Sequence, residues 1–151
     1  MAASFILVAV HWPDLPDRIP LHFGFSGRAN RWGNKAGIWF VPGVSAGFYL
    51  LMTLVSRNQA LVNLPISVDR EQPETRRLLA QFVNVLKAIT AVVLFYISWG
   101  SVNTALGRMN GLGREFLPIL IAATSIPIVV YLLRLKRQRD SLDRNRSNRD
   151  S

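Results

Sequence analysis

Three stretches of the chain hold no charged residue: AGIWFVPGVSAGFYLLMTLV (residues 36–55), AITAVVLFYISWGSVNTALG (residues 88–107) and FLPILIAATSIPIVVYLL (residues 116–133). All 18 basic and 9 acidic residues lie in the other 93 of the 151 positions. Runs of about 18 or more apolar residues can cross the roughly 30 Å hydrocarbon core of a bilayer as helices. A helix of a soluble protein would carry a polar stripe instead. The sequence therefore predicts an all-α integral membrane bundle with three full spans.

A shorter apolar segment, residues 1–10, precedes these spans. As a helix it would reach about 15 Å, which is half of a bilayer core. It has neither the basic start nor the cleavage pattern of a secretory signal. We expect a short apolar helix that is the end of a longer span, so that the gene would encode further apolar residues upstream of Met1. The alternatives are an interfacial anchor and a half-span packed against the bundle.

The distribution of basic residues predicts the domain limits and the orientation. Residues 1–134 form the predicted membrane domain, and residues 135–151 form a basic tail. The loop between the first two full spans and the region from Arg134 onward hold twelve Lys and Arg, whereas residues 11–35 and 107–115 hold six. Because positive charge is retained on the cytoplasmic side, we expect a multi-pass protein of the cell membrane. Its tail would be cytoplasmic and its 11–35 loop extracytoplasmic.

The composition argues against several other classes of protein. With no Cys and only two His, the chain offers no disulfide framework, and we expect no metal site and no cofactor. The net charge of +9 is concentrated beside a span, where we expect it to bind anionic lipid head groups rather than nucleic acid. The three charge-free windows hold no ionisable residue, which argues against a proton or ion pathway.

Small and polar residues inside the spans predict contacts between helices. Gly43 and Gly47 have the Gly-x-x-x-Gly spacing that lets two backbones approach closely, and they are the predicted face of a homo-oligomer. Ser98, Ser101 and Thr104 can share one face of the second span. We expect their hydroxyls to bond to their own helix backbone. The alternative is that they line a small cavity below the outer loop.

Charged, polar and aromatic side chains are concentrated in the outer loop, residues 11–35. This loop begins with HWPDLPDRIPLHF (residues 11–23) and ends with RWGNK (residues 31–35). Three prolines within eight residues exclude a helix and favour an extended path, and turns are expected at Ser26–Gly27 and Trp32–Gly33. The aspartates can pair with nearby arginines or with the lysine, and the histidine can face the bundle or pair with a carboxylate. The candidate ligand- or partner-binding residues are Trp12, Asp14, Asp17, Arg18, His22, Trp32 and Lys35.

This loop resembles a known bacterial family. The order Trp-Pro-x-Leu-Pro-x-x-Ile-Pro-x-His-Phe, then Gly, then Trp-Gly-x-Lys before a span, is similar to the uncharacterised N-terminal domain of SdpI-type membrane proteins, which include the immunity protein against the sporulation-delaying toxin. The resemblance implies a multi-pass bacterial membrane protein with this loop outside. Two features depart from the family: only ten residues precede the loop, and the second half of the six-span immunity protein has no counterpart here. Toxin immunity is therefore not implied.

The residues of the outer loop are compatible with two alternative classes of function. We prefer a membrane sensor or immunity-like protein that binds a ligand or a peptide or protein partner through its outer loop. The second class is a membrane enzyme that uses His22 with Asp14 or Asp17 as acid and base. The sequence has no nucleophile elbow, no His-Glu-x-x-His and no phosphate-binding glycine loop, so we expect no catalytic residues. A purely structural subunit, in which the loop caps the bundle, is the remaining alternative.

Overall fold

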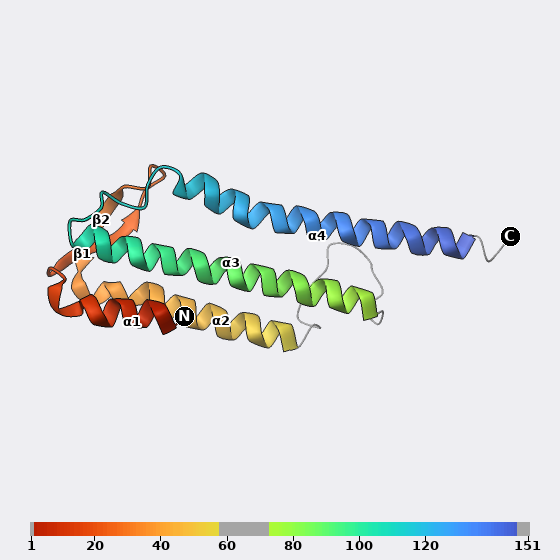
Figure 1. Cartoon of the computed structure of the whole chain (residues 1–151), viewed down its shortest axis with the longest axis horizontal. Helices are drawn as coiled ribbons and strands as arrows, with labels where there is room; N and C mark the ends of the chain where they lie inside the picture. The colour runs from red at the N-terminus through yellow and green to blue at the C-terminus, as the bar shows by residue number, and fades with distance from the viewer. Residues whose placement is uncertain (1, 58–72, 148–151) are drawn as a thin grey trace.

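A computed structural model describes residues 2–57 and 73–147 as an elongated helical bundle with a β-hairpin at one end (Figure 1). Three helical segments in this part of the chain are long and apolar enough to cross a membrane: Lys35–Val55, Arg77–Ala105 and Phe116–Ser141. They confirm the three predicted spans, and the chain is an all-α membrane bundle. The helices are α1 (Ala2–His11), α2 (Phe40–Arg57), α3 (Pro73–Ala105) and α4 (Phe116–Ser147).

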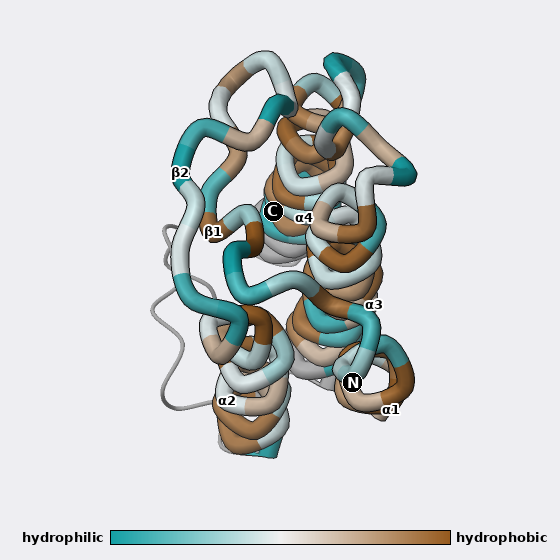
Figure 2. Tube along the Cα trace, turned by 90° about the vertical axis from the view of Figure 1, so that its left-hand side faces the viewer, coloured by the Kyte–Doolittle hydropathy of each residue, from teal (hydrophilic) through white to brown (hydrophobic). Residues whose placement is uncertain are grey.

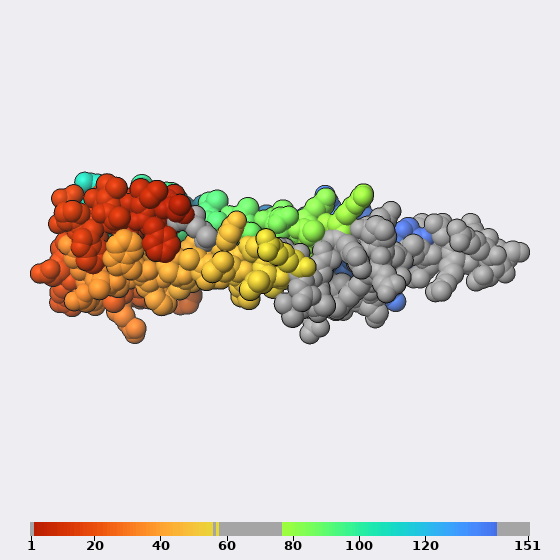
Figure 3. Space-filling model, turned by 90° about the horizontal axis from the view of Figure 1, so that it is seen from below, coloured from red at the N-terminus to blue at the C-terminus, as the bar shows by residue number. Residues whose placement is uncertain are grey.

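Helix α3 is the centre of the bundle, because α1, α2 and α4 each pack against it. Figure 1 shows α1 and α2 on one side of α3 and α4 on the other. The short α1 covers the bundle only near the hairpin (Figures 1 and 3). Outward-facing side chains of the long helices are apolar, among them Leu54, Val92 and Val129. Such a surface suits a hydrocarbon environment.

The outer loop folds into an antiparallel hairpin, in which β1 (Arg18–Phe23) pairs with β2 (Ala29–Asn34). The predicted turn at Ser26–Gly27 is confirmed as the hairpin tip. The predicted turn at Trp32–Gly33 is wrong: both residues lie within β2, where Gly33 pairs with Ile19. The side chain of Leu21 lies where a Cβ of Gly33 would be, so a larger residue at this position would require Leu21 to change its conformation. Figure 2 shows hydrophilic residues along much of β2, while the helices are largely hydrophobic.

Short 3₁₀ helices flank the hairpin: η1 (Trp12–Asp14) precedes it and η2 (Lys35–Trp39) follows it. The first of these corrects the expectation that the prolines exclude any helix from the loop. Pro13 is compatible with a short N-terminal turn, because the backbone N–H that it lacks would have no partner at that position. At η2 the side chain of Asn34 accepts a hydrogen bond from the backbone of Ala36 at 2.8 Å, which caps the turn.

A hydrophobic core joins the hairpin to the helices. Its buried members are Val8 of α1, Ile19 of β1, Val102 of α3, Leu15 and Ile38. Because these side chains come from five separate segments, the hairpin is packed onto the bundle rather than projecting from it.

The hairpin tip also docks on the connection between α3 and α4 through glycines. The backbone N–H of Leu112 donates to the carbonyl of Gly27 at 2.8 Å. Gly27 has a φ of +73°, and a Cβ at this position would overlap the carbonyl of Gly113. A Cβ at Gly111 would likewise overlap the carbonyl of Gly27. The two backbones can therefore approach this closely only because both positions are glycine.

A second hydrophobic core joins α3 to α4 near the other end. The buried residues Leu79 and Val83 of α3 meet Tyr131 and Leu135 of α4. The ring of Phe82 stacks on that of Tyr131 with centroids 4.3 Å apart. Helix α4 runs unbroken through Pro127 and past the expected domain limit at residue 134 as far as Ser147. The basic segment therefore begins as a continuation of the last span.

The second span begins earlier than its charge-free window, and it contains Lys87. The expectation that the spans hold no ionisable residue is wrong for this reason. The Nζ of Lys87 donates to the hydroxyl of Thr53 at 2.8 Å and lies 3.6 Å from the ring centre of Tyr49. The charge-free windows place Lys87 in a loop, whereas its side chain joins α3 to α2. The loop residues 58–72, on which part of the charge count rests, lie outside the described residues.

The face of α2 that carries Gly43 and Gly47 is turned away from the rest of the chain. Both glycines are exposed, and no atom lies within 4 Å of a Cβ built on either one. The spacing therefore serves no contact between helices of the described part of this chain. An oligomer formed through this face stays a prediction.

Candidate functional site

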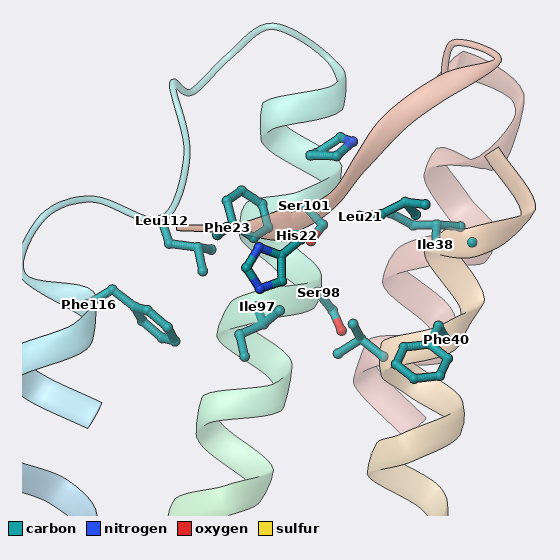
Figure 4. A pocket seen from close by; sticks show the side chains of 13 residues that line it. Leu21, His22, Phe23, Ile38, Phe40, Ile97, Ser98, Ser101, Leu112 and Phe116 are labelled. Atoms are coloured by element: carbon teal, nitrogen blue, oxygen red, sulfur yellow. The ribbon is translucent and has the colours of Figure 1, made fainter. Parts of the chain in front are cut away.

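A cavity of about 460 Å³ lies under the hairpin. Its walls come from β1, from η2 and the first residues of α2, from α3, and from the connection between α3 and α4. Most of the lining is apolar and includes Phe23, Phe40, Ile97 and Phe116 (Figure 4). Cavities of this size and character, with a few polar groups among apolar side chains, are typical of small-molecule sites.

The polar groups of this cavity are His22 of β1 and Ser98 and Ser101 of α3. Figure 4 shows the imidazole of His22 directed toward Ile97 and Ser98. Its Nδ1 lies 2.7 Å from Oδ1 of Asn30. Because an amide oxygen only accepts, Nδ1 donates this hydrogen bond, and in the tautomer that carries its one proton on Nδ1 the Nε2 atom can accept another. The ring can therefore bind a donor group of a ligand.

Ser98 and Ser101 agree in part with both interpretations of the polar residues in the second span, which are bonding to the helix backbone and lining of a cavity. The hydroxyl of Ser98 donates to the carbonyl of Leu94 in its own helix at 2.9 Å, as expected. Ser98 and Ser101 also line the cavity, which was the alternative. The expectation fails for Thr104, whose buried hydroxyl has no hydrogen-bond partner among the described residues.

Of the seven candidate residues, Trp12, Asp17 and Lys35 are brought together, but away from the cavity. The Nζ of Lys35 lies 4.8 Å from the ring centre of Trp12, and the Trp12 ring is 5.8 Å from that of Trp39. The backbone N–H of Lys35 donates to the carbonyl of Asp17 at 2.9 Å. This cluster closes the hydrophobic core at the base of the hairpin.

The expected pairing of the aspartates does not form in the described part of the chain. Asp14, Asp17 and Arg18 are exposed, and no ion pair joins either aspartate to a basic residue there. The amine of Lys35 lies over an aromatic ring instead, and Asp17 contributes its backbone rather than its carboxylate. His22 bonds to an amide rather than to a carboxylate, so these residues give no His–Asp acid–base pair.

Trp32 is 44% exposed and lies opposite Pro20 in the hairpin, outside the cavity lining. His22 is thus the one candidate residue that lines the cavity. The candidates taken from the sequence do not include Asn30, which holds the His22 ring, or Leu112. The carbonyl of Leu112 accepts a hydrogen bond from the Tyr96 hydroxyl at 2.9 Å. The Ser26–Gly27 turn alone does not indicate Asn30, because the strand register is irregular on both sides of His22, which pairs with Arg31.

The fold and the cavity define a membrane bundle whose hairpin end carries a preformed pocket. Residues 1–46 match the family model of a domain of unknown function (DUF1648). The matched segment contains α1, the hairpin, η2 and the first residues of α2, and so it supplies the β1 and α2 walls of the cavity. The walls contributed by α3 and by the turn that follows it lie outside the match. No curated protein and no solved structure matches the chain.

Proposed function

We propose that the chain is a membrane sensor or immunity-like protein that binds an apolar or amphipathic ligand in the cavity under its hairpin. The observation that carries this proposal is the position of His22, the only hairpin side chain with an ionisable group among the cavity-lining residues. A ligand with an apolar body and one hydrogen-bond donor would fill the apolar walls and bond to the Nε2 of His22. A hydrophobic segment of a peptide belongs to this class.

Ligand binding at this place would couple the hairpin to the central helix. The cavity lies between β1 and the α3 residues Ile97, Ser98 and Ser101, so a ligand would contact both elements at once. Trp32 of β2 does not line the cavity and is 44% exposed, so its ring is available to a partner. Such a sensor would therefore transmit ligand binding as a change in how stably the hairpin packs on the bundle.

We further propose that the hairpin end lies outside a bacterial cell membrane and that the C-terminal end of α4 lies in the cytoplasm. The distribution of Lys and Arg supports this orientation. The family resemblance of the loop supports a bacterial, SdpI-like protein, and the match over residues 1–46 covers the whole motif.

The orientation is tested by cysteine labelling, because the chain has no natural cysteine. Phe25→Cys at the hairpin tip, where the native side chain is 90% exposed, should react with a membrane-impermeant maleimide on intact cells. Ser141→Cys on the exposed part of α4 should react only after the cells are permeabilised. Equal labelling of both variants in detergent is the control. Labelling of Ser141→Cys alone on intact cells would reverse the orientation.

The ligand site is tested by His22→Ala with Trp32→Ala as the matched control. The probe is the fluorescent apolar anion 1-anilinonaphthalene-8-sulfonate, titrated onto the detergent-purified protein. Loss of one hydrogen bond corresponds to roughly 1 kcal/mol, so His22→Ala should bind about fivefold to tenfold more weakly. Trp32→Ala should bind as the wild type does, because Trp32 does not line the cavity.

A cavity-filling variant gives an independent reading of the same site. Ser101→Phe places a large ring among the lining residues and should abolish probe binding while the helical circular dichroism stays unchanged. If all three variants bind the probe equally well, the cavity takes no ligand, and the hairpin acts as a cap that closes the bundle.

A further inference from the structure

We propose that a groove between α3 and α4, at the opposite end of the bundle from the hairpin, binds one anionic phospholipid. Figure 1 shows the N-terminal part of α3 beside the C-terminal half of α4 at this end. Two hollows of about 480 and 570 Å³ form the groove. They adjoin each other, because Leu78, Gln81 and Arg134 line both.

The hollow nearer the end of α4 is basic. Arg77 of α3 and Arg134 and Arg137 of α4 line it, together with Gln81 and Ser141. No acidic side chain is among its described lining residues, and none of the three arginines has an ion-pair partner in the described part of the chain. Guanidinium groups bind phosphate oxygens in a bidentate manner, which a single ammonium cannot do. The chemistry of this hollow therefore fits a phosphodiester.

The second hollow is mainly apolar and extends toward the middle of the span. Phe82 and Val85 of α3 and Ile126 and Val130 of α4 are among its lining residues. Along α4 it extends from Arg134 back to Ile126, eight steps along the helix or about 12 Å at 1.5 Å per residue. An acyl chain has the width and chemistry to lie along this surface.

The order of the two hollows along the groove favours a phospholipid as the ligand. A phospholipid presents its phosphate at the membrane surface and its acyl chains toward the bilayer centre, and the groove is basic and then apolar in that order. A soluble phosphate would leave the apolar hollow empty. Unspecific attraction to a basic tail would need no groove. Basic pockets between membrane helices are known to hold anionic head groups in this way.

The groove is held open by the packing beneath it. The buried residues Leu79, Val83 and Leu135 fix the separation of α3 from α4, and the stacked rings of Phe82 and Tyr131 fix their register. The site is therefore formed before the lipid binds, which lowers the cost of ordering the arginines. It lies apart from the cavity under the hairpin, and neither proposal depends on the other.

The test compares two triple variants with equal changes in net charge. Arg77→Gln/Arg134→Gln/Arg137→Gln removes the basic hollow, and Arg31→Gln/Arg108→Gln/Arg114→Gln removes three exposed arginines at the hairpin end. Each detergent-purified protein is titrated with palmitoyl-oleoyl phosphatidylglycerol that carries a fluorophore on one acyl chain, at about 0.15 M salt. The first variant should bind roughly 10- to 100-fold more weakly than the wild type. The matched variant should stay within about twofold of the wild type, since its arginines lie outside the groove.

Competitors identify the source of the phosphate. Unlabelled phosphatidylglycerol should displace the probe, whereas phosphatidylcholine with the same acyl chains and soluble glycerol 1-phosphate should be about tenfold less effective. Val130→Trp fills the apolar hollow without changing charge and should weaken lipid binding while the circular dichroism stays that of the wild type. Should the first triple variant misfold, Arg134→Gln against Lys136→Gln is the single-residue comparison, because Lys136 does not line the hollow.

Three outcomes would overturn the proposal. Equal losses in both triple variants would mean attraction by diffuse charge. Equal competition by glycerol 1-phosphate would mean a site for soluble anions. Equal competition by phosphatidylcholine would mean an apolar surface on which the arginines play no part.

Discussion

Gly27→Ala is expected to lower the free energy of unfolding by about 3–6 kcal/mol, because three costs combine at this residue. An L-residue at its φ of +73° is strained by about 1–2 kcal/mol. The new Cβ would overlap the backbone carbonyl of Gly113, which cannot turn aside as a flexible side chain could, and overpacking of this kind costs about 1–3 kcal/mol. The hairpin tip must then retreat, which breaks the bond from the Leu112 N–H at about 1 kcal/mol.

Gly107→Ala is the matched control for that substitution. Gly107 has nearly the same φ, +70°, but no atom lies within 4 Å of a Cβ built on it. Its variant should lose only the strain, about 1–2 kcal/mol. The measurement is the unfolding midpoint of each protein in a denaturing-detergent titration. Equal losses in the two variants would show that the close approach of hairpin and turn contributes nothing to stability.

Ile19→Ala should produce the second large loss, about 2–5 kcal/mol. Ile19 is 0% exposed and packs in the core that joins β1 to α1, η2 and α3, so its truncation leaves a cavity where five segments meet. The same titration measures the effect. Because Ile19 lies on the hairpin, the variant should also expose Trp12 and Trp39 to an aqueous fluorescence quencher more than the wild type does.

Phe25→Ala is the control on the same hairpin. Phe25 is 90% exposed at the tip, so removing its ring should change stability by no more than about 0.5 kcal/mol. If Ile19→Ala were equally mild, the hairpin would be only loosely attached to the bundle. It would then not form a defined wall of the cavity.

Several features of the fold follow from local sequence alone. Residues 36–55, 88–107 and 116–133 predict their helices correctly, because the length and apolar character of a span depend on about 20 consecutive residues alone. The Ser26–Gly27 turn and the backbone bond of Ser98 are local in the same way. Trp32–Gly33 carries the same turn signal as Ser26–Gly27, yet it lies in a strand, because pairing with β1 outweighs a local preference.

The sites depend on contacts that no local pattern contains. His22 meets Asn30 only through the hairpin register, and the cavity beneath them exists only because α3 ends where the hairpin folds back. Arg77 is separated from Arg134 by 57 positions, and only the antiparallel packing of α3 on α4 brings both to one hollow. Lys87, placed in a loop by the charge pattern, meets Thr53 for the same reason. The sequence by itself determined which segments enter the membrane, since the transfer of each segment from water to lipid is its own property. The tertiary structure decided which side chains share a site, because that depends on how separate segments pack against one another.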